Sequence, residues 1–383
     1  MSEVPSEART VPQMTTELEN APLQERSPGE SCFEKIYPFE SDLKLREEYI
    51  NFFGGLRIGK LLEDLDLVAG KVAYAHAQGW ERGLGIVTAA CDRIDLTGSL
   101  PSHSDLQLLA SVNWVGRSSM EVGIRISTKS ENDWKRVARA FFIMVSRREG
   151  RAEEVNPLTP KTLEEQRRFK EGQERQRLRR EMSRYNILTV APDEQESKLL
   201  HSLFLEIREG TLKGVSMAET LRQSTRLMHP QFRNIHNKIF VGYLMRETFE
   251  LAWNITYLFC GHRPHFLSVD HMYFYEPVEI GSILSLTGQV IYTSARALMV
   301  EVTADVIDPA SGITEVTNVS YFTFTVLDKA GNSLKISQVL PESYEEGLKY
   351  LDGYKRFRLG EENEKFICTN DFFYSMPLIL QSE

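Results

Sequence analysis

A polar loop that leads into an apolar helix carries the residues best suited to chemistry. Asn234 and His236 lie in the loop, and Gly242 follows Asn234 by eight residues. The segment from Ile239 to Trp253 is apolar on nearly every side, so it predicts a buried helix. Gly242 falls in the first turn, where backbone N–H groups have no partner within the helix. This helix start can therefore bind an anion or a polarised carbonyl oxygen.

A second copy of this arrangement lies in the first half of the chain. Asn51 precedes Gly59 by eight residues, the same spacing as in the later loop. From Ile58 to Val68 the apolar residues recur at helical spacing, and Gly70 predicts the end of that helix. The sequence therefore contains an internal repeat.

The segments after the two helices repeat as well. A 22-residue spacing joins Asp92 to Trp114 and recurs between Asp270 and Tyr292. Runs rich in β-branched and aromatic residues predict strands at 85–94, 105–115, 119–128 and 136–147, and again at 266–275, 282–292, 297–307 and 315–327. Each half is thus expected to be one helix followed by about four mainly antiparallel strands, which is an α+β arrangement.

Composition limits the class of protein. The chain has 383 residues, of which 42% are hydrophobic and 26% charged, so it is long enough for two globular domains. A net charge of -9 argues against a general nucleic-acid binder. No apolar run reaches the roughly 18 residues of a membrane span. Four widely separated cysteines suggest neither a disulfide framework nor a metal site, and they favour a reducing compartment.

Two copies of a buried helix followed by antiparallel strands resemble the double hotdog fold, in which a curled sheet wraps a central helix. The Asn234-x7-Gly242 spacing is similar to that before the central helix of hotdog acyl-CoA thioesterases. Five runs over roughly residues 40–360 together resemble the acyl-CoA thioesterase 9 family: Gly-Lys-Leu-Leu-Glu-Asp-Leu-Asp (59–66), Ser-Ser-Met-Glu-Val (118–122), Arg-Pro-His-Phe-Leu-Ser-Val-Asp (263–270), Glu-Pro-Val-Glu-Ile-Gly-Ser (276–282) and Tyr-Leu-Asp-Gly (350–353).

The resemblance implies hydrolysis of fatty acyl-CoA without a metal or organic cofactor, by a homo-oligomer of double hotdogs. It also implies the mitochondrial matrix, although the acids of the N-terminal segment do not fit a presequence and leave a cytoplasmic alternative. We expect five segments: a disordered tail (1–31), an N-terminal hotdog (32–155), a charged helical linker with a solvated face (156–190), a C-terminal hotdog (191–334) and a C-terminal tail (335–383).

Asp66, seven residues after Gly59, sits where this class carries its catalytic aspartate. It lies about 10 Å along the axis from Gly59, at about 1.5 Å per residue, so it cannot easily serve its own helix start. Antiparallel packing of the two helices would instead bring Asp66 to Gly242. By resemblance, Asp66 would activate water or attack directly, Asn234 would orient the water or the carbonyl, and the Gly242 N–H would stabilise the thioester oxygen.

The reciprocal site, which pairs Asn51 with the later helix, has Phe249 at the seventh position and the acid displaced to Glu250. We therefore expect it to be degenerate. Further substrate-binding candidates are Gly59 and His236, together with Arg117 and Arg296 for the phosphates of coenzyme A.

Other interpretations remain open. Asp66 could be a solvated helix residue, Asn234 could cap the next helix, and His236 could be an ordinary loop residue. A hotdog hydratase or dehydratase would use His236 as its base. A non-catalytic acyl-CoA-binding protein would bind tightly without turnover.

Overall fold

The structure is a computed structural model that describes residues 22–370 except 97–99, 131–132, 183–190 and 329–330. The first half contains η1 (Pro28–Ser31), β1 (Phe33–Tyr37), α1 (Leu43–Tyr49), α2 (Ile58–Ala77), β2 (Gly85–Cys91), β3 (Ile94–Leu96), β4 (Leu106–Val115), β5 (Ser119–Ser130), β6 (Asp133–Arg148), β7 (Arg151–Ala152) and α3 (Leu163–Met182).

The second half contains α4 (Glu194–Arg208), β8 (Gly214–Ser216), η2 (Ala218–Thr220), β9 (Arg222–Leu227), η3 (Pro230–Phe232), α5 (Val241–Cys260), β10 (Pro264–Val269), β11 (Met272–Phe274), β12 (Ile283–Thr293), β13 (Ala297–Ile307), β14 (Thr314–Val326), β15 (Gln338–Leu340) and α6 (Tyr344–Asn370). This α+β order confirms the tandem hotdog predicted from the sequence.

The strands of both halves join into one antiparallel sheet. Its main path is β1-β4-β5-β6-β2-β11-β14-β13-β12-β9, with β3, β7 and β10 attached beside it. The two halves meet where β2 pairs with β11 and β3 pairs with β10. A short parallel pair, β8 with β15, stands apart from this sheet.

The inner face of the sheet packs on the two central helices, α2 in the first half and α5 in the second. Side chains alternate along the strands, so that Met120, Val122 and Ile124 of β5 are buried on this face. The two helices also pack against each other. This contact at the centre of the molecule brings residues from both halves into one site.

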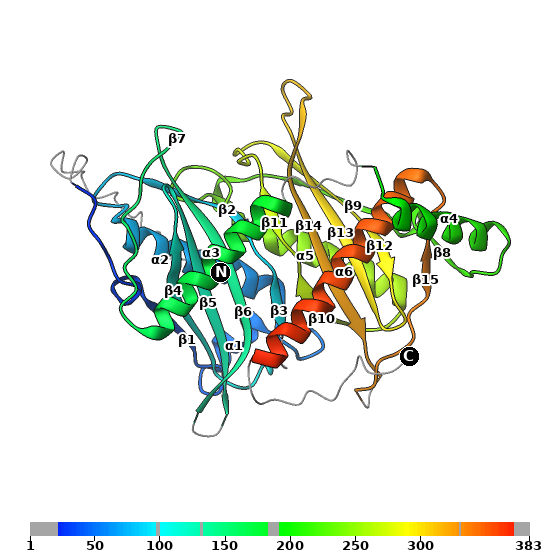
Figure 1. Ribbon diagram of the computed structural model, residues 1–383, viewed down its shortest axis with the longest axis horizontal. Helices are drawn as coiled ribbons and strands as arrows, with labels where there is room; N and C mark the ends of the chain where they lie inside the picture. The colour runs from blue at the N-terminus through cyan, green and yellow to red at the C-terminus, as the bar shows by residue number, and fades with distance from the viewer. Residues whose placement is uncertain (1–21, 97–99, 131–132, 183–190, 329–330, 371–383) are drawn as a thin grey trace.

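The outer face is covered by α3 in the first half and by α6 in the second, as Figure 1 shows. On α3, Arg175 pairs with Glu121 at 2.6 Å, and the buried Arg179 pairs with Asp92 and Glu121. The solvated face expected for this helix is therefore wrong for both arginines. Each of these carboxylates needs a cation to be buried, and the helix supplies it.

Helix α6 has the matching role in the second half, where Arg356 pairs with Asp270 at 2.7 Å and Lys349 with Glu301 at 3.0 Å. Within residues 335–383, expected as a C-terminal tail, the structure has β15 and α6, while residues 371–383 lie outside the described part.

Three further expectations need correction. Residues 28–31 of the expected disordered tail form η1, which packs near α2, whereas residues 1–21 lie outside the described part. Helix α2 does not end at Gly70 but continues to Ala77, because Val72 and Ala73 are completely buried against the sheet. The chain also contains β1 and β9, which the sequence patterns did not predict, at the two ends of the main sheet path.

Candidate active site

The start of α5 packs against the middle of α2, and the start of α2 packs against the middle of α5 in a nearly equivalent way. At the start of α5, a side chain on Gly242 would lie 2.7 Å from the carbonyl oxygen of Glu63 on α2. At the start of α2, a side chain on Gly59 would lie 3.1 Å from Arg246 and 3.4 Å from Phe249 on α5. Glycine at both positions allows this close backbone approach. The antiparallel packing expected from the sequence is therefore present, and it brings each helix start to its partner's middle.

Asp66 of α2 lies against the start of α5. The backbone N–H of Gly242 donates a hydrogen bond to Oδ2 of Asp66 at 2.9 Å, and the hydroxyl of Thr88 donates to Oδ1 at 2.6 Å. Only 5% of Asp66 is exposed, so it is not the solvated helix residue of the alternative reading. Two groups, one from β2 and one from α5, thus converge on one buried carboxylate of α2.

Burial raises the pKa of Asp66 from 3.8 to about 6, and the hydrogen bonds from Thr88 and Gly242 oppose that rise. The carboxylate is therefore a stronger base than an exposed aspartate, yet it is mostly ionised near neutral pH. A buried acid with a displaced pKa at a helix start marks a candidate catalytic group.

Thr88 was missed from the sequence, where it is one hydroxyl in the otherwise apolar strand β2. The repeat contains a signal for it. Thr88 stands four residues before Asp92, and Phe266 stands four residues before Asp270. Strand pairing shifts register just after both, between Thr88 and Ala90 and between Phe266 and Ser268. The two positions are therefore equivalent, and a polar residue in only one copy distinguishes the two halves.

Asn234 orders its own loop. Its side-chain oxygen accepts hydrogen bonds from the backbone N–H groups of His236 at 2.8 Å and Lys238 at 3.1 Å. Asn51 does the same in the first half, with Phe53 at 3.0 Å and Gly55 at 3.1 Å. The paired Asn–Gly spacings therefore reflect one loop structure used twice. Within the described residues, no hydrogen bond joins Asn234 to Asp66.

His236 contacts Tyr74, and within the described residues no hydrogen bond joins it to Asp66. Its Nε2 is 2.7 Å from the hydroxyl of Tyr74, which itself accepts a hydrogen bond from the N–H of Ile86 at 3.0 Å. Burial lowers the pKa of His236, so the ring is neutral near pH 7. The Tyr74 hydroxyl can then donate to Nε2, and the histidine fixes the loop against α2 and β2.

The reciprocal position is filled by aromatic rings. Phe249, 5% exposed, stands where Asp66 stands in the first half and packs edge-on against Phe266 at 5.3 Å and Phe322 at 5.7 Å. Glu250 points to the surface, where it pairs with Arg57 at 3.2 Å. Phe249 and Phe266 thus occupy the places of Asp66 and Thr88, so in the described part of the chain aromatic rings stand where the first site has its acid and its hydroxyl.

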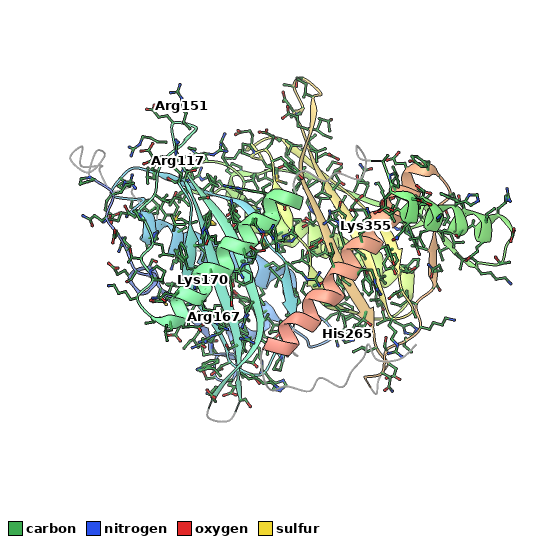
Figure 2. The ribbon with its side chains drawn as sticks, in the orientation of Figure 1. Arg117, Arg151, Arg167, Lys170, His265 and Lys355 are labelled. Carbon is green, nitrogen blue, oxygen red and sulfur yellow. The ribbon has the colours of Figure 1, made fainter. Side chains whose placement is uncertain are left out.

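The two arginines expected at the coenzyme A phosphates lie in strand turns. Arg117, between β4 and β5, has a side chain that is 77% exposed and is 3.5 Å from Glu154. Figure 2 shows it at the same end of the first half as Arg151. Arg296 lies between β12 and β13, where its carbonyl accepts a hydrogen bond from Thr325. Neither contacts Asp66 or Gly242 through a hydrogen bond between described residues.

Two hollows in the described part of the chain are relevant to the site. The larger, of about 430 Å³, lies between β9 and α5 beside Tyr243 and Arg246, and Asp66, Thr88 and Gly242 do not line it. The described residues include no group of three histidines, cysteines or acids arranged for a metal ion. None of the described helices is long and apolar enough to cross a membrane.

One curled sheet around two central helices, with a buried acid facing the start of one of them, defines the class of the protein as a double hotdog. Mouse acyl-coenzyme A thioesterase 9, mitochondrial, is 35% identical over 88% of this chain and 79% of its own length, and the human protein of that name is 34% identical over the same shares. The chain belongs to this acyl-CoA thioesterase family.

A relative from Humulus lupulus, acyl-coenzyme A thioesterase 4, mitochondrial, is 35% identical over 86% of this chain and 67% of its own length. A putative oleoyl thioesterase from Lactobacillus plantarum, 8% identical, superposes on 78% of this chain and 97% of its own with a TM-score of 0.51, and it shows the shared fold. No protein-family profile matches the chain.

Proposed function

We propose that the protein hydrolyses acyl-CoA thioesters at one composite site per chain, built from Asp66, Thr88 and Gly242. The observation that carries this proposal is the 2.9 Å contact between the Gly242 N–H and the Asp66 carboxylate, which joins the acid of one half to the helix start of the other. Membership of the thioesterase family supports the substrate class.

Asp66 acts as the general base in this proposal. It takes a proton from water as the water oxygen attacks the thioester carbon, and it returns that proton to the coenzyme A sulfur as the C–S bond breaks. Direct attack by the carboxylate, followed by hydrolysis of the resulting anhydride, needs the same ionised Asp66. Both routes therefore fail when Asp66 is protonated or replaced by an amide.

The Gly242 N–H is not free in the resting site, because Asp66 accepts its hydrogen bond. A carboxylate that gains a proton becomes a weaker acceptor. The Gly242 N–H can then donate to the thioester oxygen while negative charge develops there. A single oxyanion donor of this kind typically stabilises the intermediate by about 2.7–4 kcal/mol. Proton transfer and oxyanion stabilisation are thus linked through one backbone group.

Asn234 and His236 serve as positioning residues, since both hold the loop that leads into α5. Gly59, against Phe249, belongs to the degenerate copy. Gly85 lies three positions before Thr88 on β2 and pairs with the exposed Arg147 of β6. His236 lies beside Gly85. We propose that coenzyme A enters at this end, where Arg147 and Arg117 can meet its phosphates. Arg296, in the other half, is the equivalent candidate for the degenerate side.

The test is release of free thiol from acetyl-, butyryl- and palmitoyl-CoA by the full chain and by Asp66→Asn. Hydrolysis that depends on Asp66 would support the proposal. Hydration of enoyl-CoA without thiol release would favour the hydratase alternative, although His236 is already engaged by Tyr74. Tight binding without turnover would favour the non-catalytic binding protein. Either of these results would overturn the proposal.

We also propose a mitochondrial location, which the names of the mouse and human relatives support, and assembly into a homo-oligomer of double hotdogs. Imaging of the tagged full-length protein in cells tests the location, and a diffuse cytoplasmic signal would contradict it. Light scattering on the purified protein tests the assembly, and a monomer mass would contradict it.

A further inference from the structure

A second hollow lies on the outer face of the first half, on the opposite side of the sheet from Asp66. It measures about 340 Å³ and lies between α3 and the strands β4, β5 and β6. On β5, Ile124 points to the inner core and its neighbour Arg125 to this hollow, as alternation along a strand requires. The hollow is therefore separated from the proposed active site by the full thickness of the sheet.

Arginines dominate its lining. Six arginines contribute to the walls against three glutamates: Arg125, Arg136, Arg139, Arg167, Arg168 and Arg175, with Glu164, Glu165 and Glu171. Figure 2 labels Arg167 on α3, where the helix crosses the sheet. The excess of positive charge is unusual for a protein of net charge -9, so it is a local feature.

The three glutamates are already engaged along α3. Glu165 accepts hydrogen bonds from the backbone N–H groups of Lys161 and Thr162 at the helix start. Glu164 pairs with Arg167 at 3.1 Å, and Glu171 is 3.8 Å from Arg167. These acids therefore do not neutralise the arginines of the strands below.

Two of the arginines offer N–H donors that no carboxylate of the described residues accepts. Within the described residues, the side chain of Arg125 makes no hydrogen bond or ion pair. Arg168 donates to the hydroxyl of Ser111 at 3.1 Å, and its buried Nε atom has no acceptor. A buried unsatisfied donor costs free energy unless a ligand supplies the acceptor.

The strand register adds a like-charge pair. Arg125 of β5 and Arg139 of β6 stand directly opposite each other, and both line the hollow, while on its other side Arg139 stands opposite Asp95 of β3. Like charges at opposite cross-strand positions destabilise a sheet. An anion bound between them would remove that repulsion, and guanidinium groups match phosphate oxygens in geometry as well as charge.

We propose that this hollow is a binding site for a phosphate-bearing nucleotide, separate from the thioesterase site. Its volume lies within the range of small-molecule pockets and exceeds the needs of a single phosphate ion. The side chain of Phe141, which also lines the hollow beneath the Arg175 guanidinium at 3.9 Å, provides an apolar wall beside the charged donors. Two sources have the required chemistry, namely a free nucleotide such as ADP and the nucleotide end of a second coenzyme A molecule.

Calorimetric titration of the full chain with pyrophosphate, ADP and coenzyme A tests the proposal. We expect pyrophosphate and ADP to bind, and binding to weaken as salt increases. Binding of two equivalents of coenzyme A per chain would identify coenzyme A as a ligand of the hollow. Binding of only one equivalent of coenzyme A, together with binding of ADP, would identify the free nucleotide as the ligand. No binding of either pyrophosphate or ADP at millimolar concentration would overturn the site.

Variants connect the binding to the named donors. Arg125→Gln and Arg168→Gln should each weaken ADP binding by at least about tenfold, the effect of losing one charged hydrogen bond. Arg151→Gln, in an exposed turn of β7 away from the hollow, is the matched control and should bind as the wild type does.

Thermal unfolding separates a binding role from a structural one. Without ligand, Arg125→Gln should unfold at the same temperature as the wild type or higher, because it removes the repulsion with Arg139. It should also lose the rise in unfolding temperature that ADP gives the wild type. Unchanged ADP affinity in both Arg125→Gln and Arg168→Gln would place the nucleotide elsewhere and refute the assignment. Because these readouts are independent of turnover, they can fail or succeed separately from the thioesterase proposal.

Discussion

Replacing Asp66 with asparagine tests the proposed chemistry most directly. The pKa of Asp66 is raised to about 6, so the carboxylate is protonated in acid and ionised above neutrality. We expect kcat/KM of the wild type for butyryl-CoA to rise about tenfold per pH unit up to pH about 6 and to level off above pH about 7. Asp66→Asn should lose at least about 100-fold at pH 8 and show no such rise.

The same substitution should make the protein more stable. Burial disfavours the ionised form of Asp66, so the folded state loses stability as pH rises through the folded pKa of about 6, and the penalty is absent below the ordinary value of 3.8. The difference corresponds to about 3 kcal/mol at pH 8. Asparagine can keep both contacts, because its oxygen can accept from the Gly242 N–H and its amide can donate to the Thr88 hydroxyl.

Denaturant unfolding at pH 4 and pH 8 measures this effect. Asp66→Asn should exceed the wild type by up to about 3 kcal/mol at pH 8 and by little at pH 4. Asp64→Asn is the matched control, because Asp64 is also buried on α2 but accepts hydrogen bonds from Tyr37 and Tyr49 rather than from Gly242. It should lower stability and spare the chemical step. Activity of Asp66→Asn within about fivefold of the wild type would refute the reasoning.

Three further substitutions test the surroundings of Asp66. Thr88→Val removes a hydrogen bond that lowers the Asp66 pKa, so the midpoint of the pH–rate profile should move up by about one pH unit; an unchanged midpoint would contradict this. Gly242→Ala would place a methyl group 2.7 Å from the Glu63 carbonyl oxygen, so denaturant unfolding should show a loss of about 1–3 kcal/mol, and thiol release should fall. Phe249→Ala should lower the free energy of unfolding by about 3–5 kcal/mol while thiol release at low temperature persists, and loss of catalysis in the folded variant would mean that the second site is not degenerate.

The repeat explains why much of the site could be predicted from sequence. Equal Asn-to-Gly spacings correspond to two loops in which Asn51 and Asn234 accept hydrogen bonds from the second and fourth residues that follow. Once two equivalent helices are assumed to pack antiparallel, helix rise alone brings the residue seven positions after the glycine of one helix to the start of the other. The proximity of Asp66 and Gly242 was therefore predictable. Their catalytic roles remain predictions.

Other features depend on contacts that sequence patterns do not reveal. Arg179 looks like a solvated residue of a charged helix, but it is buried because it meets Asp92, 87 residues earlier in the chain. Gly70 looks like a helix end, but burial of the next turn outweighs the cost of about 1 kcal/mol for an internal glycine. In both cases tertiary packing decides a structure that local propensity leaves open.

The asymmetry between the halves follows from the energetics of burial. Each half presents the residue seven positions after its first-turn glycine to the start of the partner helix, but an ionised acid in that place costs about 3 kcal/mol at neutral pH. A second buried acid would add a similar penalty. Phe249 and Phe266 instead fill the equivalent place with apolar surface, which stabilises the fold. The first half can therefore carry the destabilising acid that the proposed chemistry uses, while the second supplies the helix start that the acid faces and an apolar core that supports both.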